Sequence, residues 1–149
     1  GFNYRMSNVV AAIGLAQVEK ADDYKAMRIR NHQLYKKYLA DVPGIIFQSE
    51  PAEGCEDVCW MNTIVVDQAK YGHHKDELIA HLKENEIDTR LLFTGIHKQK
   101  AMADYGCDCS GEYPVCEWLT ENGFYLPSAS SLTEEQIRFI CKVIADYQK

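Results

Sequence analysis

The sequence has no long apolar run and no concentration of positive charge. No stretch approaches the roughly 18 consecutive apolar residues that a membrane-spanning helix needs, and no secretory signal peptide is recognisable. Sixteen Lys and Arg residues stand against 22 Asp and Glu residues, for a net charge of -6, and no basic cluster offsets this acidic balance. These absences argue against a membrane protein, a secreted protein and a nucleic-acid binder, so a cytoplasmic location is expected.

Internal repeats and low-complexity tracts are also lacking. The 149 residues can bury one hydrophobic core but are too few for two, so a single domain over residues 1–149 is expected. Because the first residue is not Met, the chain is expected to be a cut or mature product of a longer protein.

Six cysteines are present, and nothing in the sequence suggests an oxidising compartment, so free thiols are favoured over disulfides. A zinc site could be drawn from Cys55, Cys59, Cys107, Cys109 and Cys116. However, a C-x-C spacing is not the usual paired zinc knuckle, and no His follows at a ligand interval. No metal site is predicted, and a redox or zinc module stays open as a minor alternative.

The first 17 residues, GFNYRMSNVVAAIGLAQ, join a polar segment to a helix that is apolar on every side. Asn3 and Arg5 supply an amide and a fixed cation, groups that position phosphate or another oxyanion. Ser7 provides an N-cap hydroxyl, and nearly every residue from 9 to 18 is apolar. Such a helix needs cover on two sides. We expect the chain's own core to cover one side and a second domain or subunit to cover the other.

The remaining patterns predict an α+β fold, in which a long N-terminal helix and a small antiparallel sheet covered by helices form two layers. The capping box that begins at Thr133 predicts the start of a final amphipathic helix. The predicted helices are Ser7–Leu39, Lys75–Glu84, Tyr113–Glu121 and the final one, and the predicted strands are Ile45–Gln48, Trp60–Asp67, Ile87–Phe93 and Phe124–Leu126.

Two polar residues stand out within this framework. Arg90 is a charge inside a strand, which places it either at a solvent-facing edge or in a site at the strand end. His97 lies in a loop rich in polar donors, between a Gly-Ile step and a basic pair, where it could meet a diphosphate or a sugar hydroxyl. An ordinary surface histidine is the alternative.

The opening run G-F-N-Y-R-M-S-N-x-x-A-A-I-G-L-A-Q-x-E resembles the segment that begins the C-terminal part of the DegT/DnrJ/EryC1/StrS family, the pyridoxal-phosphate-dependent sugar aminotransferases. The resemblance continues through residues 87–93, 95–99 and 123–128 to the final helix, and so covers essentially the whole chain. Within the family it is nearest to enzymes resembling perosamine synthase, which aminate a 4-keto-6-deoxy nucleotide sugar in polysaccharide or O-antigen biosynthesis.

This resemblance implies the small C-terminal domain of a fold-type I aminotransferase that works as a homodimer with an amino-acid amino donor. In the family, the cofactor lysine and most of the phosphate cup belong to a larger N-terminal domain, which these residues do not include. No catalytic residue is therefore predicted in this chain, and we expect the chain alone to be inactive.

The resemblance also implies roles for four residues. Asn3 would reach the pyridoxal 5'-phosphate of the neighbouring subunit, and Arg5 would help to hold the same loop or the substrate's phosphates. His97 and Arg90 would face the nucleotide sugar and orient it. The family often has Pro where Lys100 stands here, which affects the expected backbone path near His97.

Two other functions stay open. The same family includes sugar dehydratases, whose histidine in place of the cofactor lysine would lie outside this chain. A non-catalytic dimerisation or binding module would also account for the apolar helix.

Overall fold

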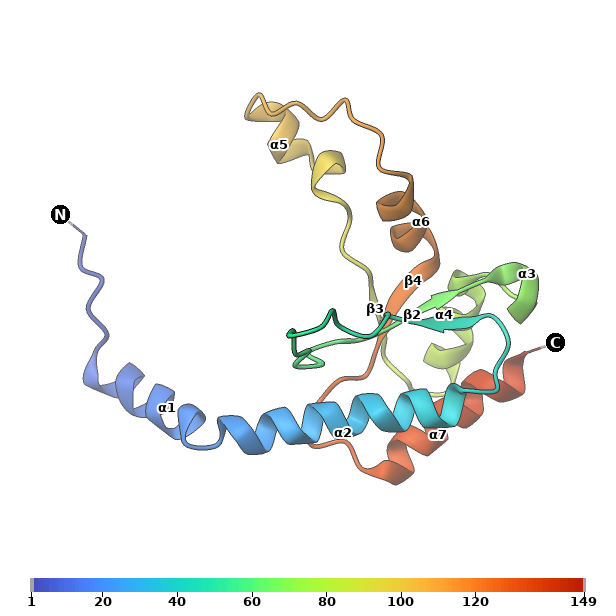
Figure 1. Ribbon diagram of the computed structural model, residues 1–149, viewed down its shortest axis with the longest axis horizontal. Coiled ribbons are helices and arrows are strands. Elements are labelled where there is room, and N and C mark those ends of the chain that lie inside the picture. The colour runs from blue at the N-terminus through green and yellow to red at the C-terminus, as the bar shows by residue number, and fades with distance from the viewer. Residues whose placement is uncertain (1, 149) are drawn as a thin grey trace.

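A four-stranded antiparallel sheet lies at the centre of the fold, with strand order β1-β2-β4-β3 (Figure 1). The structure is a computed structural model that describes residues 2–148. Its strands are β1 (Ile45–Phe47), β2 (Asn62–Val66), β3 (Arg90–Leu91) and β4 (Gly123–Leu126). Its helices are α1 (Asn8–Val18), α2 (Ala21–Leu39), α3 (Gln68–Tyr71), α4 (Lys75–Glu84), the 3₁₀ turn η1 (Ile96–Lys98), α5 (Lys100–Asp104), α6 (Pro114–Asn122) and α7 (Glu134–Tyr147).

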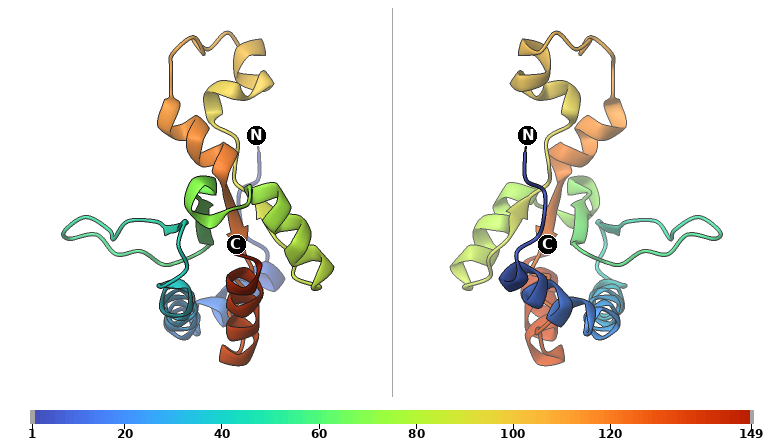
Figure 2. Two further views of the ribbon diagram at one scale, coloured as in Figure 1. Left: turned by 90° about the vertical axis from the view of Figure 1, so that its right-hand side faces the viewer. Right: turned by 90° about the vertical axis from the view of Figure 1, so that its left-hand side faces the viewer.

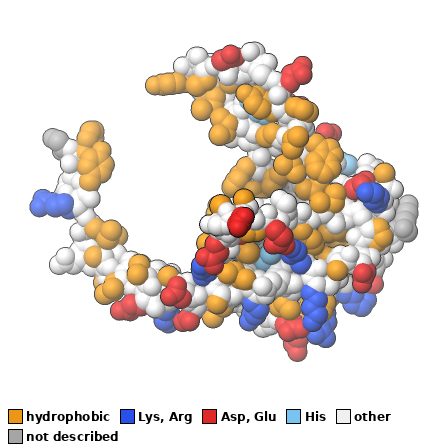
Figure 3. Space-filling model, in the orientation of Figure 1, with side chains coloured by type: hydrophobic (Ala, Val, Ile, Leu, Met, Phe, Trp, Pro, Cys, Tyr) orange, Lys and Arg blue, Asp and Glu red, His pale blue; other side chains and the backbone are white. Residues whose placement is uncertain are grey.

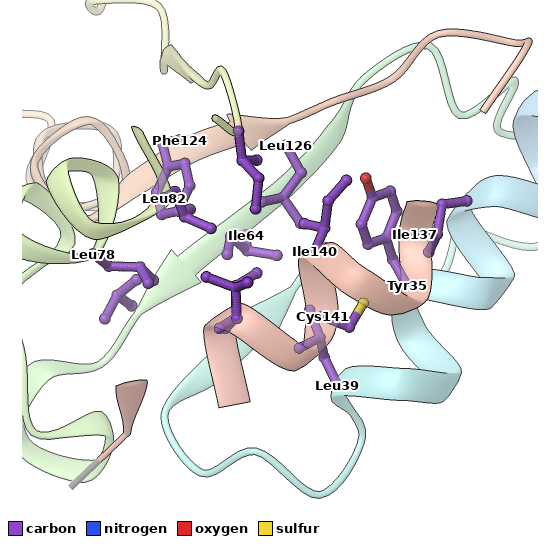
Figure 4. Packing of buried hydrophobic residues seen from close by; sticks show 14 of the residues in the cluster. Tyr35, Leu39, Ile64, Leu78, Leu82, Phe124, Leu126, Ile137, Ile140 and Cys141 are labelled. Carbon is purple, nitrogen blue, oxygen red and sulfur yellow. The ribbon is translucent and has the colours of Figure 1, made fainter. Parts of the chain in front are cut away.

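The hydrophobic core lies between one face of the sheet and the helices α2, α4 and α7 (Figure 4). Alternate residues of a strand point to the same face, and Ile64 pairs with Phe124 across β2 and β4, so both side chains enter this core. Most of the other fully buried members come from the helices, and one comes from β2: Tyr35, Leu39, Val66, Tyr71, Leu78, Leu82, Ile137 and Ile144. The predicted α+β class is confirmed.

The last helix begins as the sequence predicts. The Thr133 side chain accepts from the Gln136 N–H and the Gln136 side chain accepts from the Thr133 N–H, which completes the capping box. At the other end, the Tyr147 ring stacks between two imidazoles, 4.2 Å from the His73 ring and 4.1 Å from the His81 ring. These contacts fix the C-terminal turn of α7 against α4.

The prediction of one long helix over Ser7–Leu39 is wrong, because two helices occupy this range. Helix α1 ends at Val18 and α2 begins at Ala21, with Lys20 between them at φ -114° and ψ 10°. Neither Pro nor Gly marks the break. The physical signal is the change from an apolar run to acidic residues, since Asp22 and Asp23 lie in the first turn of α2, where carboxylates favour a new helix N-terminus.

The prediction that the chain's own core covers one side of α1 is also wrong. No residue of α1 is buried, and the apolar side chains of Val9, Ile13 and Val18 are 71%, 62% and 72% exposed. The helix stands away from the body in Figure 1, and its apolar atoms are visible in Figure 3. Both sides of α1 are therefore available for another domain or subunit.

An arm made of residues 94–122 projects from one end of the sheet (Figures 1 and 2). It holds η1 and α5, which lie where the sequence predicts only a loop, and α6, which was predicted. Strand β3 is shorter than predicted at both ends, because its pairing with β4 begins only at Arg90 and the chain leaves the sheet after Leu91 to enter this arm. No helix within residues 2–148 has the length and apolar character to cross a membrane.

Candidate functional site

The polar N-terminal turn is built by Asn3 and Arg5. The Asn3 Oδ1 accepts a hydrogen bond from the Arg5 backbone N–H at 3.0 Å and one from the Arg5 Nε at 3.4 Å. Both residues are exposed, and the Asn3 Nδ2 has no hydrogen-bond partner within residues 2–148. An amide donor beside a guanidinium suits the phosphate end of a cofactor, which binds through anionic oxygens.

His97 is held in the arm by residues of α6. Its Nε2 lies 3.3 Å from the Glu117 Oε1, and its ring centroid lies 4.5 Å from that of Tyr113. The Lys98 Nζ lies 3.3 Å from the same Glu117 oxygen. Hydrogen bonds from Lys98 first and then from His97 lower the pKa of Glu117. The His97 side chain is only 13% exposed, so it is a packed residue and not a solvated surface group.

Arg90 lies on β3, an edge strand, directly opposite Tyr125 of β4. It is exposed, and its guanidinium makes no hydrogen bond or ion pair within the described residues. It lines a hollow of about 980 Å³ at the sheet end, together with Asp88, Tyr125 and Phe139. Arg90 is therefore at an edge of the sheet and also lines a hollow.

The four predicted residues do not form one site within this chain. Asn3 and Arg5 share a turn, but that turn stands far from the arm that carries His97 (Figure 1). Arg90 and His97 line separate hollows, of about 980 Å³ and 470 Å³. Each group offers donors for an anionic or polyhydroxylated ligand, and further protein surface is needed to enclose any such ligand.

Residues 1–145 match the DegT/DnrJ/EryC1/StrS aminotransferase family. The chain belongs to this family. It is 32% identical over 147 residues to the GDP-perosamine synthase of Escherichia coli O157:H7, a match that covers 99% of the chain and 38% of that relative. The resemblance drawn from the sequence motifs is thereby confirmed.

Solved structures share the fold of this chain. A DegT/DnrJ/EryC1/StrS aminotransferase from Brucella abortus is 26% identical with a TM-score of 0.82, and the match covers 99% of the chain and 37% of the relative. The E. coli GDP-4-keto-6-deoxy-D-mannose-3-dehydratase, solved with bound hydrated PLP, shares the fold at 20% identity and a TM-score of 0.81, covering 97% of the chain and 36% of the relative. The chain thus spans little more than a third of the length of these relatives.

The contacts between His97 and helix α6 were not predicted from the sequence of this aminotransferase-family chain. Glu117 lies 20 positions after His97 and looks like an ordinary acidic residue in a first helical turn. Gly95 is equally inconspicuous, yet a Cβ there would lie 2.6 Å from the His97 Cε1 and 2.7 Å from the Cys116 Sγ. Only the fold brings these groups together.

The cysteines of this family member are all free thiols in the structure. Cys107, Cys109 and Cys116 line the same hollow as His97. Within residues 2–148, however, no three His, Cys, Asp or Glu side chains are grouped so that they could hold a metal ion.

The rate of alkylation should differ between the exposed and the buried thiols. Cys55 and Cys107 are exposed, whereas Cys141 is buried and its burial raises the pKa of its thiol to about 12. At pH 8 we expect iodoacetamide to modify the two exposed thiols of the folded chain and to reach Cys141 only in denaturant, because the thiolate is the nucleophile. Peptide mass spectrometry measures each site. If Cys107 reacts only after a reductant is added, the free-thiol assignment is contradicted.

Proposed function

We propose that the chain is the C-terminal domain of a pyridoxal-phosphate-dependent aminotransferase that converts a 4-keto-6-deoxy nucleotide sugar into the amino sugar. The observation that carries this proposal is the 32% identity to a GDP-perosamine synthase over nearly the whole chain. Polysaccharide or O-antigen biosynthesis is the process that such a product would serve.

The two residues of the N-terminal turn are proposed to bind the cofactor phosphate of a partner subunit in a homodimer. The Asn3 amide would donate to a phosphate oxygen, and the Arg5 guanidinium would add positive charge beside it. The bound pyridoxal phosphate supplies the electron sink that amino transfer requires. The uncovered apolar surface of α1, which follows this turn directly, supports a subunit contact here.

Arg90 and His97 are proposed to face the nucleotide sugar. Arg90 offers a guanidinium without a partner among the described residues, suited to a phosphate oxygen, and His97 offers a ring held in one orientation. Their role is to orient the keto carbon for amination, which is catalysis by positioning. The cofactor lysine is proposed to lie outside the chain, which alone would be inactive.

A dehydratase is the second candidate, because a sugar 3-dehydratase shares the fold with a TM-score of 0.81. The two reactions leave different products, since amination replaces the keto oxygen by an amino group whereas dehydration removes a hydroxyl.

The test compares the chain alone with the protein encoded when the upstream sequence of its gene is included. Each is incubated with pyridoxal phosphate, a GDP-linked 4-keto-6-deoxy sugar and a set of amino acids, and the products are identified by mass spectrometry. We expect amino sugar only from the longer protein. A deoxy product in place of an amino sugar would establish the dehydratase, and activity of the chain alone would refute the proposed division of roles.

A further inference from the structure

Glu117 joins the two basic residues of η1 to helix α6. One of its oxygens, Oε1, lies 3.3 Å from the His97 Nε2 and 3.3 Å from the Lys98 Nζ. The Tyr113 ring packs against the imidazole. A single carboxylate thus orients the His97 ring and the Lys98 ammonium at the start of the arm.

This contact decides which ring nitrogen of His97 carries the proton. The pKa of Glu117 is lowered, so the group is an ionised carboxylate at neutral pH and can only accept hydrogen bonds. The His97 Nε2 must therefore be the donor, and in the neutral ring the Nδ1 keeps its acceptor lone pair. No hydrogen-bond partner of the Nδ1 is found within residues 2–148, and the Nδ1 is not among buried unpaired atoms there. Gly95 lets its backbone and the Cys116 side chain pack close to this edge of the ring, because a Cβ there would lie 2.8 Å from the Nδ1 and 2.7 Å from the Cys116 Sγ.

Helix α6 is itself fixed to the body of the fold. The ammonium of Lys75, which is 8% exposed at the start of α4, donates to the Thr120 carbonyl at 2.7 Å. A cation at this position also favours the negative end of the α6 dipole. The Thr120 hydroxyl lies 3.4 Å from the Phe93 carbonyl, which ties α6 to the segment leading into the arm. Glu117 is therefore presented from an anchored helix.

We propose that Glu117 is a positioning residue for nucleotide-sugar binding. It holds His97 so that the Nδ1 accepts a hydrogen bond from a hydroxyl of the sugar or ribose, and it keeps the Lys98 ammonium beside the ring to meet the diphosphate. This assignment rests on the proposed function, and it adds the residue that sets the tautomer of the His97 ring.

The experiment uses the full-length enzyme, three single variants and one double variant. Glu117→Gln keeps the size of the side chain but removes the charge that fixes the His97 proton. We expect the KM for the nucleotide sugar to rise about tenfold, as the loss of one charge-assisted hydrogen bond predicts, while kcat changes less than about twofold. Glu121→Gln makes the same chemical change at the exposed last turn of α6 and should leave both constants unchanged.

Nitrogen NMR of labelled histidine supplies a readout that a purely structural role would not move. Wild-type His97 should show the Nε2–H tautomer, and Glu117→Gln should show a mixture of tautomers. The third variant, His97→Asn, should raise the KM by itself, and adding Glu117→Gln to it should raise the KM by a smaller factor than Glu117→Gln does alone, because only the contact with Lys98 is then left to lose. This non-additivity keeps the proposal testable even if Glu117→Gln lowers the melting temperature.

An unchanged KM and an unchanged tautomer in Glu117→Gln would overturn the proposal, as would additive effects of Glu117→Gln and His97→Asn. A wild-type enzyme that aminates no nucleotide sugar would overturn the proposed function instead. In that case the NMR result still tests whether Glu117 fixes the ring.

Discussion

Replacing Ile13 by aspartate is expected to convert the full-length enzyme from a dimer into monomers. Ile13 lies in the middle of α1 and is 62% exposed in this chain, and Val10 beside it is 53% exposed. Under the proposed function, a second subunit covers this surface. A carboxylate buried there without a partner costs several kcal/mol, which corresponds to an increase of about 1,000-fold in the dimer dissociation constant. Sedimentation velocity measures the change.

The control for this variant is Val58→Asp. Val58 is an apolar side chain of similar exposure, 51%, but it lies in the loop between β1 and β2 and not in α1. This variant should stay dimeric at the concentrations where Ile13→Asp dissociates. Dimers that survive Ile13→Asp with wild-type affinity would show that α1 meets a domain of its own subunit and not a partner.

Replacing Asn3 by aspartate should weaken pyridoxal phosphate binding to the full-length enzyme by about a hundredfold or more. Aspartate keeps the Oδ1 that accepts from the Arg5 N–H, so the local turn is preserved. It loses the amide donor and places a negative charge beside the phosphate, and losing a hydrogen bond to a charged group alone costs about 1.5–3 kcal/mol. The cofactor dissociation constant can be measured by fluorescence titration of the apoenzyme.

Asn8→Asp is the matched control for the cofactor experiment. It makes the same chemical change five residues later, at the first turn of α1, where a carboxylate favours the helix N-terminus. Cofactor affinity should be unchanged in this variant. If Asn3→Asp also binds pyridoxal phosphate as the wild type does, the amide of Asn3 is not a phosphate ligand.

The elements that could be predicted are those whose signals are local. Helix α4 matches the predicted range Lys75–Glu84, and α7 begins at its predicted capping box, because caps and helical periodicity involve residues only a few positions apart. The break at Lys20 and the short helices α3 and α5 were missed. A short helix has too few turns to show a periodic pattern, and the break has no Pro or Gly to mark it.

In the candidate site, too, only the contacts between residues close in sequence could be predicted. The pairing of Asn3 with Arg5 is local and could be expected from five residues of sequence. The separation of Arg90 from His97 and the pairing of His97 with Glu117 depend on how the arm folds back on itself. Composition and spacing carry no information on that path, so the partner of His97 could be found only in three dimensions.

The order of the strands has a consequence for how this chain can misassemble. Its two outer strands are β1, with three residues, and β3, with two. A growing fibril needs a long row of unpaired backbone N–H and C=O groups as a template, and strands this short offer few of them. Aggregation of the isolated chain should therefore proceed by coalescence of α1 surfaces into amorphous, detergent-soluble clusters, without the ordered cross-β stacking of amyloid.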